Sequence, residues 1–265
     1  MKINENKIFS FMKLIKELNF SKIIYEILIK FGLSKTSNIA LYINYKFKSY
    51  PKKQIFFFHI SKCAGTALRD TFNEISSNSE NKILRFGHAV KAKHVNFMKK
   101  NRYLINIREP IDRFLSAFYD RKKSKNLIDP VEINCFKIFP DANLLGEALN
   151  SNDEKLINKA KFALTKIALV NHRYKDWFDI KFLKTHQPYF IFEQENIQQD
   201  FKIFCKKINY EEKIILKIVN KNQIYPEKTI LTDLSKKNLK LFFKEDFEIY
   251  NYLLQIKEII NNPSN

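Results

Sequence analysis

The sequence predicts an α/β protein in which helices flank a parallel sheet. Two short runs are almost entirely apolar, Gln54–Ile60 and Tyr103–Ile107. Such runs are typical of strands that are buried on both faces, as in parallel sheets. Each run precedes a segment with helical spacing, and this alternation of strand and helix is typical of a parallel sheet with crossover helices.

The remaining elements follow from the same patterns. A weaker strand is expected over Ile83–Phe86 and a fourth over Tyr189–Phe192. The helix that begins at Pro110 has proline in its first turn, where its missing N–H costs nothing. Further helical segments are expected over residues 67–75, 110–125, most of 126–182 (including 152–170), 197–207, 211–219 and 234–260.

The composition indicates one compact unit with helical additions at both ends. The chain has 265 residues, 45% of them hydrophobic, with only 4 Gly and 7 Pro. This length and apolar content allow a substantial core and exclude a disordered protein. We expect a helical extension over residues 1–50 and one α/β domain over 51–265.

The N-terminal extension is apolar but interrupted by charges. No uncharged run within Ile8–Phe31 approaches the roughly 20 residues of a spanning helix, and no signal peptide is evident. We favour helices packed on the domain; the alternative is a basic amphipathic segment on an anionic membrane. Three widely spaced cysteines indicate a reducing compartment. The expected location is the cytoplasm, with peripheral contact at the inner membrane face as the variant.

The formal net charge of +19 points to anionic partners. Nucleic acid, anionic lipid, a phosphate-rich cofactor and an acidic glycan all fit this charge. Lys greatly outnumbers Arg, so part of the charge is interpreted as a solvated lysine surface. Charge alone does not choose among these partners.

The segment after the first strand has the features of a phosphate-binding turn. Small residues at Ala64, Gly65 and Ala67 let backbone N–H groups at the start of a helix approach an anion closely. Lys62 adds a charge beside them. No carboxylate follows Thr66 in the first helical turn, where one would stabilise an empty helix N-terminus. The alternative is an ordinary turn that Thr66 caps.

This turn differs from the nucleotide-triphosphate loop, because Lys62 precedes Gly65 instead of following it. It resembles the 5′-phosphosulfate loop of sulfotransferases, and most closely that of carbohydrate sulfotransferases such as the glycosaminoglycan 2-O-sulfotransferases. The resemblance implies a P-loop-like fold and 3′-phosphoadenosine 5′-phosphosulfate (PAPS) as the donor. It implies that Lys62 is a catalytic residue, which contacts the bridging oxygen of the donor. It also implies that the donor is bound by Lys62, Cys63, Ala64, Gly65, Thr66 and Ala67.

A second motif resembles the 3′-phosphate site of the same family. Arg108 ends a strand, an acid and a proline follow, and Ser116 stands eight positions after Arg108. An arginine at the carboxyl end of a parallel strand is placed to grip a phosphate. Ser116 lies opposite the apolar stripe of its helix, so we expect its hydroxyl to be available to the same phosphate. The alternatives are a surface salt bridge and a solvent-facing serine.

The catalytic base is expected to be a histidine. His88 follows Gly87 after a predicted strand, and carbohydrate members of the family place their catalytic histidine in a similar Gly-His element. His94 is the second choice, and His59 is expected to pack or orient the loop. The remaining candidates are His172, His186 and Glu193. No metal is required by this reading.

The resemblance covers residues 53–125 closely and 189–252 loosely, but not the N-terminal helices or residues 126–182. It implies a sulfotransferase domain over 51–265 that sulfates a carbohydrate hydroxyl, for example on a bacterial cell-surface polysaccharide or glycolipid. Adenosine 3′,5′-bisphosphate (PAP) is the expected product, and nucleic acid is not an expected partner. The alternatives are a nucleotide-dependent P-loop kinase, or a basic protein that binds nucleic acid or membrane.

Overall fold

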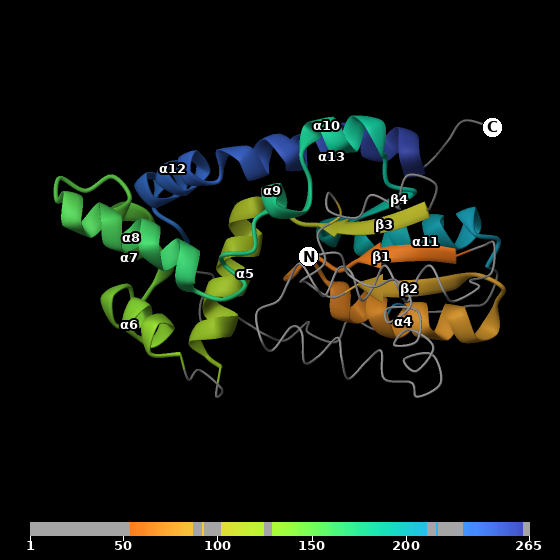
Figure 1. Ribbon diagram of the computed structural model, residues 1–265, viewed down its shortest axis with the longest axis horizontal. Coiled ribbons are helices and arrows are strands. Elements are labelled where there is room, and N and C mark those ends of the chain that lie inside the picture. Colours follow the sequence, from red (N-terminus) through yellow and green to blue (C-terminus); the bar gives the residue numbers. More distant parts are fainter. Residues whose placement is uncertain are drawn as a thin grey trace, which may run out of the picture.

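A four-stranded parallel sheet organises the part of the chain that the structure describes (Figure 1). The computed structural model describes residues 54–86, 92, 102–124, 129–210, 216 and 230–261. The strands run in the order β2-β1-β3-β4 and comprise Gln54–Phe58 (β1), Lys82–Phe86 (β2), Arg102–Ile107 (β3) and Phe190–Glu193 (β4). The predicted α/β class with a parallel sheet is confirmed. The predicted extension over residues 1–50 lies outside the described residues.

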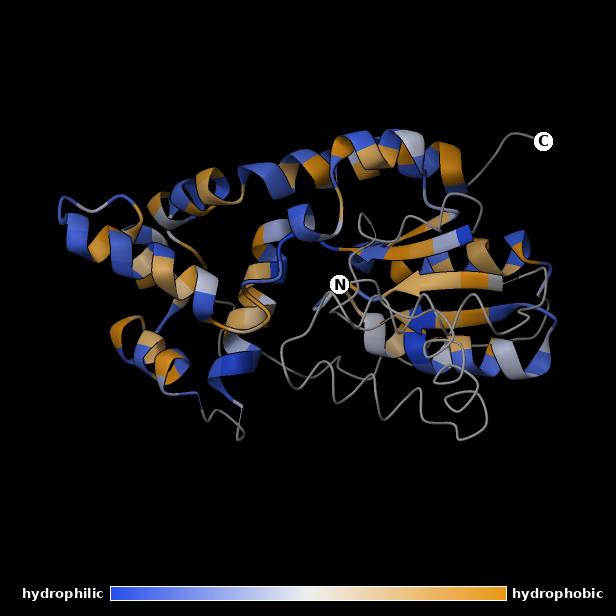
Figure 2. Cartoon of the chain, viewed as in Figure 1, coloured by the Kyte–Doolittle hydropathy of each residue, from blue (hydrophilic) through white to orange (hydrophobic). Residues whose placement is uncertain are grey.

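Both faces of the sheet are buried, as the apolar runs predict. Ile55 and Phe57 of β1 contribute to one core cluster, whereas Phe56 and Phe58 contribute to another. This alternation follows from the period of two in a strand. Figure 2 shows that hydrophobic residues occupy most of the sheet's length. Water is therefore excluded from both sides of the central strands.

Helices cover the two faces of the sheet (Figure 1). On one face lie α4 (Gly65–Asn78) and α11 (Ile197–Lys207). On the other lie α9 (Tyr174–Trp177), α10 (Ile180–Thr185) and α13 (Lys244–Asn261). Because α13 packs on the sheet through Ile249 and Leu253, the predicted C-terminal helical addition is an integral part of the core.

A second, all-helical lobe has its own hydrophobic core. It is built from α5 (Pro110–Lys122), α6 (Pro130–Ile138), α7 (Ala142–Ala148), α8 (Glu154–Lys166) and α12 (Asp233–Phe242). Of these helices, α6, α7 and α8, together with α9 and α10 on the sheet, account for the mostly helical character predicted for residues 126–182. Figure 1 shows α5 between this lobe and the sheet, so α5 links the two cores.

Most element boundaries differ from the sequence prediction by one to four residues, and two differences have a visible cause. The helix predicted over 211–219 lies outside the described residues, apart from Leu216. The first strand ends at Phe58 instead of Ile60, because the backbone N–H of Ile60 is bonded to a side chain of β3 and leaves the strand ladder. The helix predicted over 234–260 is two helices, α12 and α13, divided at Phe243. At that break, Arg173 donates to the carbonyl oxygen of Phe242, which takes this carbonyl away from regular helix bonding.

A buried cation ties α13 to the edge of the sheet. Lys257 is 2.8 Å from Glu193 at the end of β4 and 3.0 Å from Asp200 of α11. Burial alone would raise the pKa of the Glu193 carboxyl, but the bonds from Lys257 and Asn196 lower it overall. Lys257 thus compensates two carboxylates that would otherwise be buried without a cation.

Lys257→Ala is expected to lower the free energy of unfolding by about 3–5 kcal/mol, because it leaves buried charges uncompensated. Lys244→Ala on the same helix is the matched control. Its exposed ammonium is 4.0 Å from Glu248, so its loss is expected to cost under about 1 kcal/mol. Urea denaturation of both variants measures the difference. Equal effects of the two substitutions would contradict the role given to Lys257.

Candidate functional site

The turn between β1 and α4 presents an uncapped helix N-terminus. Lys62 and Ala64 adopt the left-handed region with φ of 65° and 59°. Ala64 is the N-cap residue of α4, no side chain caps the helix, and its first turn holds no acid. The alternative in which Thr66 caps the helix is therefore wrong. The orphan N–H groups and the helix dipole make this end of α4 suited to an anion.

Asn106 of β3 holds the turn in place. Its Oδ1 accepts from the backbone N–H of Ile60 at 3.0 Å, and its Nδ2 donates to the carbonyl oxygens of Ile60, at 3.3 Å, and Cys63. Asn106 is fully buried. Sequence reasoning missed this residue, although one amide inside an otherwise apolar strand was the signal that could have found it.

Gly65 is required by a close approach of His59. A Cβ atom at Gly65 would lie 1.8 Å from Cδ2 of His59, so no larger residue fits without displacing the ring. His59 is buried against the start of α4. The structure thus places His59 where the sequence predicted it, as a residue that packs on the loop.

Arg108 lies beside the same turn. Its Nη1 is 3.5 Å from the carbonyl oxygen of Lys62, and its Nε has no hydrogen-bond partner among the described residues. The hydroxyl of Tyr174 accepts from the backbone N–H of Arg108 and donates to its carbonyl oxygen, both at 2.7 Å. Tyr174 was not predicted. It fixes the backbone from which the Arg108 guanidinium reaches the turn.

Ser116 does not lie on an open face of α5. It is only 3% exposed and has interactions of its own within the fold. The alternative of a solvent-facing serine is wrong, because the side of α5 opposite its apolar stripe is also covered. Arg113, one turn earlier on that side, is fully buried as well. That the hydroxyl binds a phosphate stays a prediction.

An ion pair joins the turn to α5. Nζ of Lys62 is 3.2 Å from Oδ1 of Asp120, with the two side chains 19% and 33% exposed. Asp120 stands one helical turn beyond Ser116, and it was missed because the motif ends before it. The contact places Lys62 alongside the helix that begins after Arg108. The two predicted anion-binding segments therefore lie together at the carboxyl edge of the sheet.

Two carboxyl groups flank Arg108. Burial raises the pKa of Glu195, while the charge of Arg108 opposes that rise. Burial also raises the pKa of Glu109, whose carboxylate accepts from the backbone N–H of Asp112 at the start of α5. This edge therefore holds both cations and acids. An anionic ligand has to compete with Asp120 for Lys62 and with Glu195 for Arg108.

The predicted base lies outside the described residues, as does His94. Besides His59, His172 also contacts the turn, because its Nδ1 is 3.1 Å from Oγ of Ser61. His186 lies at the opposite, amino edge, where its carbonyl oxygen accepts from the Tyr103 hydroxyl. Glu193 is bonded to Lys257.

Cys63 is buried within the turn, next to the hydroxyl of Tyr174. Burial raises the pKa of its thiol to about 11, although the nearby Arg113 and Arg108 guanidinium groups oppose this. The neutral thiol is thus a packing residue of the cradle. Its backbone N–H, and not its sulfur, is the group suited to an anion.

The comparisons with known proteins give no family: no family model, no curated protein and no solved structure matches the chain. Within the described ranges, no helix is long and apolar enough to cross a membrane, and no cluster of three or more His, Cys, Asp or Glu is arranged to hold a metal ion.

Asn106→Ala is expected to loosen the turn and expose Cys63. The change leaves the N–H of Ile60 and the carbonyl of Cys63 unpaired in a buried place, at a cost of about 1–3 kcal/mol. Alkylation of Cys63 at pH 8 should accelerate by about tenfold or more through local opening. Peptide mass spectrometry after iodoacetamide pulses measures the rate at each cysteine.

Cys135 is the internal control, because it is buried in the helical lobe. An equal acceleration at Cys135 would mean global unfolding. An unchanged rate at Cys63 would show that Asn106 does not hold the turn.

Proposed function

We propose that this chain is a sulfotransferase that transfers a sulfuryl group from PAPS to a carbohydrate hydroxyl. The observation that carries the proposal is the proximity of two cationic segments, with Arg108 Nη1 3.5 Å from the carbonyl oxygen of Lys62. Both segments leave the carboxyl ends of neighbouring strands of a parallel sheet, where such sheets bind ligands. The proposal includes a P-loop-like architecture for this sheet.

In this proposal the turn after β1 binds the 5′-phosphosulfate. The uncapped N–H groups of α4 and the Lys62 ammonium supply positive charge without a metal. Arg108 and Ser116 bind the 3′-phosphate. Nε of Arg108 supports this role, because it has no hydrogen-bond partner in the part of the chain that the structure describes, and a buried guanidinium N–H is stabilised by an anionic acceptor.

The chemical step needs a base and a group that stabilises the leaving phosphate. His88 accepts the proton of the acceptor hydroxyl while the new S–O bond forms and the bond to the bridging oxygen breaks. Lys62 stabilises the charge that develops on that oxygen. His94 remains the second choice from the sequence; among the histidines that the structure describes, His172 is the candidate for the base, because it contacts Ser61 at the start of the turn.

One observation disfavours the alternative of a P-loop kinase. That reading uses the acid at the end of β4 as a metal ligand. The Glu193 carboxylate is bonded to both Lys257 and Asn196, so cationic and amide groups already satisfy it. The order of Lys62 and Gly65 also differs from that of a nucleotide-triphosphate loop.

PAP is expected to raise the melting temperature of the chain, whereas ATP with magnesium is not. At about 100 times Kd, a ligand that binds only the folded state stabilises it by about 2.7 kcal/mol. Arg108→Ala should lose most of this shift, and Arg102→Ala, at the exposed amino end of the same strand, should keep it. His88→Ala should keep the shift and lose turnover by about 10²-fold or more.

A shift with ATP and magnesium but none with PAP would overturn the sulfotransferase in favour of the kinase. A PAP shift that Arg108→Ala retains would remove Arg108 from the donor site. Unchanged turnover of labelled donor in His88→Ala would exclude His88 as the base and move the test to His172→Ala.

Asp120→Asn is expected to tighten PAP binding. Its carboxylate holds the Lys62 ammonium at 3.2 Å, and a donor phosphate has to replace that bond. For a partly exposed pair the gain is about 0.2–1 kcal/mol, or roughly 1.5- to 5-fold in Kd by calorimetry. Asp112→Asn is the control, because it removes an exposed acid from the same helix. Weaker binding in Asp120→Asn would show that Asp120 positions Lys62 and does not compete with the ligand.

A further inference from the structure

The outer face of α12 combines lysines with exposed leucines. Leu234 and Leu241 are 48% and 67% exposed. They are seven residues apart, which places them on nearly the same side of a helix, with Lys237 between them. The buried side of α12, formed by Ser235, Asn238 and Leu239, packs on α7, where Asn238 donates to the carbonyl oxygen of Gly146, and the two leucines lie at the edge of this side. The helix is therefore amphipathic, and part of its solvent side is apolar.

Other exposed apolar side chains gather at the start of this helix. Ile230 is 83% exposed, and its carbonyl oxygen accepts from Asn143, the neighbour of the exposed Leu144. Asn143 also accepts from the backbone N–H of Thr232, the N-cap residue of α12. The structure thus brings three of its exposed large apolar residues, Leu144, Ile230 and Leu234, to the start of α12, with Leu241 two turns further along.

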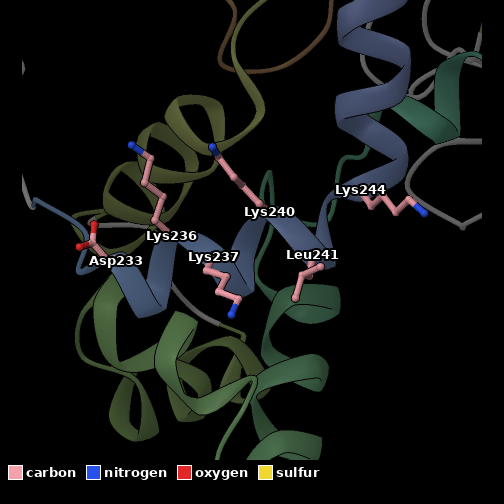
Figure 3. A pocket seen from close by; sticks show the side chains of 6 residues that line it. All are labelled: Asp233, Lys236, Lys237, Lys240, Leu241 and Lys244. Atoms are coloured by element: carbon pink, nitrogen blue, oxygen red, sulfur yellow. The ribbon is translucent and has the colours of Figure 1, made fainter.

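The lysines of the same helix line a surface groove of about 370 Å³ (Figure 3). Figure 3 shows Lys236 and Lys240 extending to one side of α12, and Lys237 and Leu241 to the other. Lys244, at the start of α13, completes the lining, and Asp233 is the one acid in it. The groove is therefore strongly basic.

We propose that this face, defined by Leu234, Leu241 and the four groove lysines, docks on an anionic membrane surface. The lysines bind headgroup phosphates, and the leucines enter the boundary between headgroups and acyl chains. Charge complementarity selects an anionic partner. The exposed leucines favour a bilayer over nucleic acid or a soluble acidic glycan, neither of which would bury them.

This face belongs to α12, which packs on α5, the helix that begins after Arg108. Burial raises the pKa of Glu109, and the charge of Lys240 opposes that rise, so Lys240 of α12 lies within electrostatic reach of the residue after Arg108. Docking would hold the carboxyl edge of the sheet near the bilayer. If the proposed function holds, this placement suits a lipid-linked carbohydrate acceptor; the docking itself does not depend on that function.

Vesicle co-sedimentation of the full chain at about 0.1 M salt tests the proposal. The chain should bind phosphatidylcholine vesicles that contain 30% phosphatidylglycerol and should not bind pure phosphatidylcholine. Leu234→Gln with Leu241→Gln, and separately Lys237→Gln with Lys240→Gln, should each weaken binding by about tenfold or more. All four positions are exposed, so melting temperatures should remain near that of the wild type.

Lys202→Gln with Lys206→Gln is the matched control, because it removes the same charge from the exposed side of α11. It should change vesicle binding by less than about threefold. Equal weakening by this control would mean nonspecific attraction and overturn the proposal. Wild-type binding in both α12 variants would place any membrane contact elsewhere in the chain.

Loss of binding in the lysine variant but not in the leucine variant would show that the face attracts anions without inserting its leucines, and would also overturn the proposal. The PAP melting shift reports on the proposed function separately, so failure of one does not imply failure of the other.

Discussion

The hydrogen bonds of Asn106 are the constraint from which the site is built. Neighbouring parallel strands end at the same edge of a sheet, but this alone does not determine the path of the chain beyond them. Asn106 makes three bonds to the segment that leaves β1, and Arg108 follows it by two residues. One buried amide therefore fixes the distance between the Lys62 turn and Arg108. The charged side chains of the site are therefore brought together by a tertiary contact between the ends of β1 and β3.

A second layer of buried polar groups keeps Arg108 in position. Asp246 of α13 accepts from the backbone N–H of Tyr174 and from the Arg173 side chain. Tyr174 in turn is bonded to both backbone groups of Arg108. Such a network is costly to bury unless its members satisfy one another, and once satisfied it rigidifies its surroundings. The C-terminal helix thus contributes to the geometry of a site to which it supplies no ligand-binding residue.

The sequence predicted the sheet well because β1, β3 and β4 are largely apolar runs, whereas β2, which contains Lys82 and Arg85, gave a weaker pattern. The helix α11 was predicted over its observed bounds. The alternative of a solvent-facing Ser116 was wrong, since helical periodicity identifies the apolar side of α5 but does not show that the other side is covered as well. Asp120 and Tyr174 were missed because neither belongs to a local pattern; they reach the turn only after the chain has folded. The division at Phe243 was missed for the same reason, because its cause is Arg173, seventy residues away.

The charge balance of the site argues for a ligand with more than one anionic group. Lys62 is already paired with Asp120, and the Arg108 guanidinium already interacts electrostatically with the Glu195 carboxyl. A ligand with a single carboxylate would exchange one such contact for another and gain little. A phosphate carries more charge than the acid that it displaces, and the helix N-terminus adds an attraction that Asp120 does not use. A molecule with phosphates at both ends gains at Lys62 and at Arg108 together, which supports a bisphosphorylated nucleotide over a simple acid.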